Sequence, residues 1–209
     1  MKKILLLAAT AICLFSCSST KLISSWKAKD ANVNKYDKVL VIAITGAKDR
    51  EIRQSVEQAM AQRLQEAGIP AVTAMDQYGP KKFDKMTEET AVKMVSDNGF
   101  DAVMVIALVD KSNQRNYTPA YTTNTPVAVM RGGRWYPYYS VLYDRTYTPG
   151  YYTTSTNYTL EANFYATKGD KLEYSAQAKS FDPGSASTLA SDFSKTVVED
   201  MKKKAVVGG

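Results

Sequence analysis

The stretch KVLVIAIT, residues 38–45, is a continuous apolar run that lies between Asp37 and Gly46. A run of this length predicts a β-strand that is buried on both faces of a sheet. A second run of the same kind, FDAVMVIALVD at residues 100–110, follows later in the chain. The two runs therefore indicate a sheet whose central strands are covered by other elements.

The residues between these runs predict helices that connect parallel strands. Asp49 can cap a helix whose apolar residues recur at helical spacing, and Gly68 stands where a left-handed residue ends that helix. Arg53 and Glu57 are spaced for an i,i+4 ion pair. A short apolar segment at 69–74 and a second helix complete the connection. This order is typical of a small parallel sheet with right-handed crossovers.

The second half of the chain has a different pattern. Residues 155–166 and 171–180 alternate between apolar and polar side chains, and Gly169-Asp170 between them is a two-residue hairpin signal. The final helix carries apolar residues four apart: Leu189, Phe193, Val197 and Met201. The predicted fold class is α+β, with a mixed sheet, a βαβαβ start, an antiparallel hairpin, a C-terminal helix and the helices on one face.

The amino terminus, MKKILLLAATAICLFSC, has two lysines, an apolar run and a small residue before Cys17. The apolar run is shorter than the roughly 20 residues that span a bilayer, and the whole segment predicts a signal peptide over residues 1–16. Leu14 to Cys17 resembles the lipobox of bacterial lipoproteins. That resemblance implies cleavage before Cys17 and a diacylglycerol thioether on its sulfur, so the expected partner is a membrane, reached through covalent lipid.

The expected location is the periplasm-facing leaflet of the outer membrane, because Ser18 is not the aspartate that retains lipoproteins at the inner membrane. Residues 17–25 are expected to be a lipidated polar tether, and residues 26–204 a single domain. Removing residues 1–16 lowers the formal net charge from +6 to +4. A small excess of this kind, spread along the chain, does not indicate a nucleic-acid partner.

Several features of the domain resemble small envelope lipoproteins of the curli-secretion and Tol-associated amino-terminal-domain type, and especially their uncharacterised single-domain relatives. The resemblance covers about residues 24–204. The matching positions are the SSWK segment before the first strand and Arg50, Glu57, Gly99, Asp101, Gly169 and Asp170. It implies the fold and a setting in envelope assembly, and it carries over no catalytic residue.

A tyrosine-rich insertion occupies about residues 117–156. Two of its segments nearly repeat, YTPAYTT at 117–123 and YTPGYYTT at 147–154, and a Gly-Gly turn lies between them. Three interpretations are open: the tyrosines cover the sheet, they bind a sugar, peptidoglycan strand or protein partner, or the segment is part of a membrane hairpin in an oligomer. The predicted partner-binding residues are Arg131, Arg134, Trp135, Tyr136, Tyr138 and Tyr139.

No catalytic, metal or cofactor site is predicted. The chain has no histidine and two cysteines, and it carries neither a G-x-S-x-G motif nor a phosphate-binding glycine loop. Glu88 and Glu89 are expected in the first turn of a helix, where acids face the helix dipole. The predicted function is a non-catalytic, lipid-anchored envelope lipoprotein that acts as an interaction or assembly module, with an envelope protein or a second copy as partner. The alternative is a lipoprotein that binds carbohydrate or peptidoglycan through the insertion.

Overall fold

The computed structural model describes residues 19–46, 48–80, 88–127, 142–169 and 171–207. Within these residues the chain separates into two compact units, one that ends at Ser112 and resumes at Thr156, and one over Asn113–Ser155. The second unit spans nearly the residues of the tyrosine-rich insertion. The predicted signal peptide, Cys17 and residues 128–141 lie outside the described residues.

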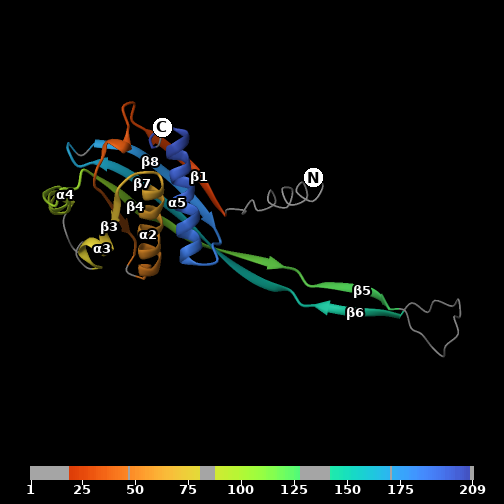
Figure 1. Cartoon of the computed structure of the whole chain (residues 1–209). Helices are drawn as coiled ribbons and strands as arrows, with labels where there is room; N and C mark the ends of the chain where they lie inside the picture. The colour runs from red at the N-terminus through yellow and green to blue at the C-terminus, as the bar shows by residue number, and fades with distance from the viewer. Residues whose placement is uncertain (1–18, 47, 81–87, 128–141, 170, 208–209) are drawn as a thin grey trace, which may run out of the picture. The chain divides into compact units, whose positions relative to one another are not determined.

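The first unit is built on a mixed six-stranded sheet with the order β1-β8-β7-β4-β2-β3 (Figure 1). The strands are β1 (Thr20–Lys27), β2 (Val39–Ile44), β3 (Ala71–Thr73), β4 (Ala102–Thr118), β7 (Tyr151–Ala166) and β8 (Lys171–Phe181). β2 pairs in parallel with both β3 and β4, whereas β8 pairs antiparallel with both β7 and β1. The predicted α+β class and its mixed sheet are confirmed.

Four described helices accompany the sheet: α2 (Arg50–Glu66), α3 (Ala74–Tyr78), α4 (Glu88–Asp97) and α5 (Ala186–Lys203), with a 3-10 turn at Val33–Lys35. α2 and α5 lie side by side on one face (Figure 1). Gly68 follows α2 with a φ of 82° and Gly99 follows α4 with a φ of 72°, so both take the left-handed conformation expected at a helix end.

The main core lies between the sheet and the two long helices. The inward residues of β7 and the predicted stripe of α5 are both buried, as the alternation and the four-residue spacing predict. A second, smaller cluster lies on the opposite face of β2, where Leu40 packs with Ala74 of α3, Val95 of α4 and Phe100. The short helices therefore supply a core of their own, which the sequence pattern did not predict.

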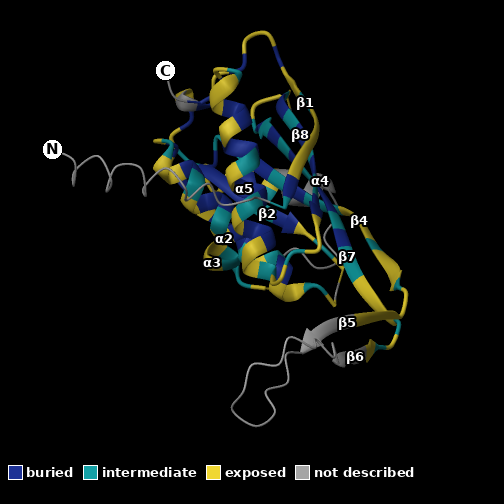
Figure 2. Cartoon of the chain, turned by 90° about the vertical axis from the view of Figure 1, so that its right-hand side faces the viewer, coloured by how far each residue is buried: buried dark blue, intermediate teal, exposed yellow. Residues whose placement is uncertain are grey.

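The structure differs from the predicted tether over residues 17–25, because β1 already begins at Thr20. β1 is an edge strand that pairs with β8 from Thr20↔Ser180 to Lys27↔Tyr174. Its side chains are mostly exposed (Figure 2), so composition alone resembles a polar linker. Backbone pairing to β8 gives this segment the order that its own residues do not indicate.

The predicted alternation of β8 is wrong near its start, where the strand contains a β-bulge. Phe164 of β7 is opposite Tyr174, but Tyr165 is opposite Leu172, so Glu173 is the extra residue. The bulge changes the phase of the strand, and Glu173 becomes buried with 1% of its surface exposed. Leu172, predicted to share a face with Tyr174, instead pairs with Tyr165 on the opposite face.

Candidate functional site

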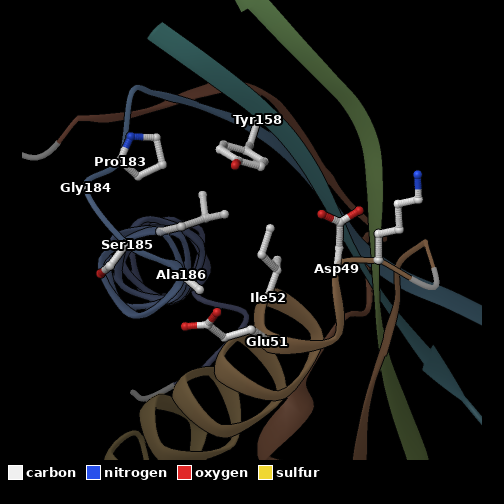
Figure 3. Close-up of a pocket in the computed structure, with 10 residues that line it drawn as sticks. Asp49, Glu51, Ile52, Tyr158, Pro183, Gly184, Ser185 and Ala186 are labelled. Atoms are coloured by element: carbon white, nitrogen blue, oxygen red, sulfur yellow. The ribbon is translucent and has the colours of Figure 1, made fainter. Parts of the chain in front are cut away.

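The first candidate site is a pocket of about 280 Å³ in the first unit, at the edge of the sheet where β2 and β8 end. The loops after these strands lead into α2 and α5, so the amino termini of both helices line the pocket (Figure 3). Tyr158 of β7 completes the wall. Pockets at the carboxyl ends of parallel strands commonly bind ligands in α/β proteins.

The charged groups of this pocket are already engaged or lie apart. Lys111 donates a hydrogen bond to Oδ1 of Asp49 at 2.7 Å, and its ammonium group lies 5.4 Å from the centre of the Tyr158 ring. The hydrogen bond to Asp49 raises the pKa of Lys111 above its usual range. Asp49 stands at the amino-terminal cap position of α2 but makes no side-chain capping bond. In Figure 3 its carboxylate and that of Glu51 point in different directions, so they do not form an acid–base pair.

The hydroxyl of Ser185 is also occupied. It accepts a hydrogen bond from the Thr188 amide at 3.1 Å and thereby caps α5. Among the residues that line the pocket, none is a nucleophile held by a neighbouring base.

Three buried acids elsewhere in the first unit have structural roles. Glu57 accepts backbone hydrogen bonds from Ala43 and Met75, each at 3.0 Å. β3 ends at Thr73, so Ala43 has no strand partner on that side, and the carboxylate of Glu57 takes the place of one. Burial raises the pKa of Glu57, and this effect outweighs the two amides and the guanidinium of Arg53, which lower the pKa.

The other two buried acids fasten the carboxyl-terminal part of the chain. Oε1 of Glu173 accepts hydrogen bonds from Lys35 at 2.6 Å and from the Tyr36 hydroxyl at 2.8 Å. Asp200 of α5 accepts a hydrogen bond from the fully buried Tyr174 at 2.8 Å. Each carboxylate therefore accepts a hydrogen bond from a buried tyrosine, which offsets part of the cost of burying a charged group, while Oε2 of Glu173 is buried without a hydrogen-bond partner among the described residues. Among the described residues, no group of three or more potential ligands is placed to hold a metal ion.

The second candidate site is the arm, the name used here for the second unit, Asn113–Ser155. Its outer part is the antiparallel pair β5 (Tyr121–Val127) and β6 (Leu142–Thr148), in register from Tyr121↔Thr148 to Val127↔Leu142. Five of its tyrosines have half or more of their surface exposed: Tyr117, Tyr121, Tyr147, Tyr151 and Tyr152. The arm thus presents aromatic rings to solvent along its described length.

Two of these rings form a tilted aromatic pair with an arginine beside it. The ring centres of Tyr117 and Tyr152 are 4.8 Å apart, and the guanidinium of Arg115 lies 5.1 Å from the centre of the Tyr152 ring. Tilted aromatic pairs and an arginine over a ring are favourable contacts that also appear in binding surfaces. Sequence reasoning did not select these two tyrosines individually, although the near-repeats at 117–123 and 147–154 contain Tyr117 and Tyr152.

The near-repeats have a structural explanation. YTPA ends β4 and YTPG ends β6, so the Pro119-Ala120 and Pro149-Gly150 dipeptides interrupt the two sides of the arm at the same level. Proline cannot donate to a strand ladder, which explains the break on both sides. A Cβ at Gly150 would lie 2.5 Å from the Tyr117 hydroxyl oxygen and 3.0 Å from the Ala120 nitrogen, so this close approach requires glycine.

The predicted binding residues of the insertion lie outside the described residues. This holds for Arg131, Arg134, Trp135, Tyr136, Tyr138 and Tyr139, and also for Cys17. Their roles therefore stay predictions. None of the described helices is both long enough and apolar enough to cross a membrane.

Comparisons with known proteins give structural neighbours only. The PelC dodecamer structure from Paraburkholderia phytofirmans has a TM-score of 0.45 at 11% identity, over 85% of this chain and 94% of that one. The lipoprotein GNA1162 from Neisseria meningitidis has a TM-score of 0.44 at 16% identity, over 80% of this chain and 99% of that one. No protein-family model and no curated protein matches the chain. No residue role is transferred from these neighbours.

Proposed function

We propose that this chain is a lipid-anchored, non-catalytic lipoprotein of the bacterial envelope, and that its arm is an interaction module for a protein partner or for other copies of the chain. The observation that supports this most is the exposure of the arm's tyrosines. The first unit has its own buried core, and none of the tyrosines of the arm whose burial is described, Tyr117, Tyr121, Tyr147, Tyr151 and Tyr152, belongs to it. The rings of the arm are therefore not needed to complete that core.

The composition of the arm favours a recognition role. Asn113–Ser155 contains nine tyrosines and one tryptophan, together with four arginines and one acidic residue. Tyrosine, tryptophan and arginine are the residues enriched at the energetic centres of protein interfaces. An arm with three more positive than negative charges suits a partner whose surface is acidic or rich in hydrogen-bond acceptors.

The anchor is proposed at Cys17. The charged residues, apolar run and small residue that precede it support a cleaved signal, and several acyl chains at about 0.8 kcal/mol per buried CH₂ would make attachment effectively permanent. We place the anchored protein on the periplasmic side of the outer membrane. Cells fed radiolabelled palmitate should label the natural chain and not the Cys17→Ala variant, and equal labelling of both would refute the anchor.

The absence of catalysis is part of the proposal. In the pocket at the helix termini, Asp49 is engaged by Lys111 and Ser185 caps α5, while the buried acids of the first unit bind backbone or tyrosine donors. These groups hold the fold together and are not free to act on a substrate.

The decisive experiment is recovery of a defined envelope complex with the tagged, full-length protein from detergent extracts. Replacing Trp135 and Tyr138 by serine should weaken recovery of the partner at least tenfold while changing stability by less than about 2 kcal/mol. Trp26→Ser is the matched control, because Trp26 is an exposed aromatic residue of β1 in the first unit. Equal loss in the control and in the arm variant would refute a specific role for the arm.

A second candidate function is the binding of carbohydrate or peptidoglycan. The tilted pair of Tyr117 and Tyr152 rings with Arg115 favours it, since sugar rings pack on aromatic faces while arginine donates to their oxygens. Binding to purified peptidoglycan that is lost in a Tyr152→Ser variant, without recovery of any protein partner, would favour this candidate over the first.

A further inference from the structure

The ordered domain begins almost immediately after the proposed lipid anchor. Ser19 is fixed at both of its backbone groups: its amide donates to Oδ2 of Asp192 at 3.3 Å, and its carbonyl accepts the Phe181 amide at 3.1 Å. Cys17 is two residues away, and two residues span at most ~7 Å whatever their conformation. If Cys17 carries lipid in the bilayer, Ser19 and its neighbours are held against the membrane surface.

The residues around Ser19 have the character of a membrane-contact surface. We define the anchor patch as Lys21, Leu22, Ile23, Lys179 and Phe181, which lie at the β1 start and β8 end of the sheet; Leu22, opposite the buried Ala178, lies on the other face of the sheet from Lys21 and Lys179. Leu22, Ile23 and Phe181 are 37%, 53% and 43% exposed, although all three are large and apolar. The strand β1 that carries two of them is coloured mainly as exposed in Figure 2.

Two cations flank the exposed ring of the anchor patch. The ammonium groups of Lys21 and Lys179 lie 5.8 Å and 5.4 Å from the centre of the Phe181 ring. Lys21 and Lys179 are opposite each other in the β1–β8 pair, so they share a face. Apolar side chains next to lysines are the combination that binds the interface of anionic bilayers, with rings and aliphatic chains among the headgroups and ammonium groups on the phosphates.

The nearby acids are engaged in local bonds. Asp192 accepts the Ser19 amide and Asp182 accepts the Thr156 amide at 3.0 Å. Each carboxylate is directed to a backbone donor and not to the two lysines.

The edge of β1 is poorly suited to pairing with another strand. The register of β1 against β8 shifts between Leu22 and Ser24, so Ile23 forms a bulge. A bulge together with lysines at positions 21 and 27 is a device that prevents strand addition at a sheet edge. The exposed apolar residues of this edge therefore fit a lipid surface better than a second copy of the chain.

We propose that the anchor patch is a bilayer-contact surface, which holds the first unit with its β1 start and β8 end against the headgroups of the membrane that carries the anchor. This inference rests on the proposed lipidation of Cys17. It predicts that anchoring fixes the orientation of the first unit instead of leaving it on a flexible tether. The edge of the sheet that contains the amino termini of α2 and α5 then faces the bilayer, and the carboxyl end of α2 faces away.

The test uses the full-length lipoprotein, reconstituted in vesicles of phosphatidylethanolamine and phosphatidylglycerol at 3:1. In the mature chain the only cysteine is Cys17, which lipid would block, so single cysteines can be labelled with an environment-sensitive fluorophore. Phe181→Cys and Ile23→Cys place the label in the anchor patch. Glu66→Cys is the control, because Glu66 is an exposed residue at the far end of the 17-residue helix α2, roughly 25 Å from its start.

We expect lipids with a headgroup-level quencher to reduce emission at positions 181 and 23 at least threefold more than at position 66. Replacing Lys21 and Lys179 by glutamine should at least halve this difference in quenching. Reconstituting the protein in phosphatidylcholine vesicles should reduce the difference by at least the same factor. Equal quenching at positions 181 and 66 in protein that floats with the vesicles would overturn the patch while leaving the anchor intact. Protein that does not float would refute the anchor itself. Disulfide-linked dimers of the Phe181→Cys variant, together with unquenched labels, would place a second copy on this surface and overturn the proposal.

Discussion

Replacing Tyr174 by phenylalanine tests the network that connects the edge strand β1 to the core. Tyr174 is fully buried and donates to Asp200 at 2.8 Å. Asp200 lies 3.7 Å from Lys204, and Lys204 donates to the Ser25 carbonyl of β1 at 2.9 Å. The network therefore joins β8, α5 and β1 through three side chains.

The expected cost follows from the geometry. Phenylalanine fills the same space, so no cavity forms, and the change removes one hydrogen bond to a charged acceptor that is 9% exposed. Such a bond contributes about 1.5–3 kcal/mol. We expect the free energy of unfolding to fall by about 2 kcal/mol in urea titrations followed by circular dichroism. Tyr165→Phe, on the open side of β7, is the control and should change it by less than about 0.5 kcal/mol.

The pH dependence provides a second readout. Burial, reinforced by Asp200, raises the pKa of Tyr174 far above that of a free tyrosine. The pKa of this tyrosine in the unfolded chain is about 10, and above that pH the native state keeps a proton that the unfolded state loses. The contribution of the buried hydroxyl to the free energy of unfolding is therefore fully present below pH 10 and is lost as the pH rises. Above pH 10, the free energy of unfolding of the natural chain should fall by up to about 1.4 kcal/mol per pH unit relative to that of Tyr174→Phe. Parallel stability curves above pH 10, or an unchanged stability at pH 7, would refute a buried and hydrogen-bonded hydroxyl.

Three further substitutions test other parts of the structure. Glu57→Ala leaves the Ala43 and Met75 amides without an acceptor and should lower the free energy of unfolding in urea by about 3 kcal/mol. Glu66→Ala on the same helix is the control and should lower it by less than about 0.5 kcal/mol. Equal costs would show that Glu57 does not hold the end of β2. Gly68→Ala forces a residue with a side chain to a φ of 82° and should cost about 1–2 kcal/mol, whereas Gly184→Ala, which has open space around its Cβ position, should be neutral. Gly150→Ala should disturb the contact with Tyr117, so limited proteolysis should cut the arm at least fivefold faster. The urea midpoint of the first unit should not fall, and an unchanged cleavage rate would contradict the close approach.

Local patterns predicted much of the first unit. The run at 38–45 became β2, the run at 100–110 became the start of β4, and the four-residue spacing after Ser185 became α5. These predictions succeeded because burial imposes a period that is visible in the residues themselves. Gly68 and Gly99 were also predictable, because left-handed helix ends favour glycine.

The features that were missed depend on contacts between distant segments. β1 is ordered by its pairing with β8, so its polar composition indicated a tether. The bulge at Glu173 changes the face of Leu172, and no local signal marks it, because Lys35 and Tyr36 stabilise it from elsewhere in the chain. Of the candidate sites, the tyrosine-rich segment was recognised by composition. The Tyr117, Tyr152 and Arg115 group was not, because it depends on which residues face each other across the arm.

The paired interruptions at Pro119 and Pro149 restrict how the arm can change during evolution. A residue inserted into β5 alone shifts its partners in β6, and one residue inserted into each strand preserves pairing but turns every side chain beyond that point to the opposite face. Only insertions or deletions of two residues in each strand, made together, keep both the pairing and the faces of the tyrosines. Related chains that use the same surface should therefore differ in the combined length of β5 and β6 by multiples of four residues, and an engineered pair of strands should be lengthened by the same step.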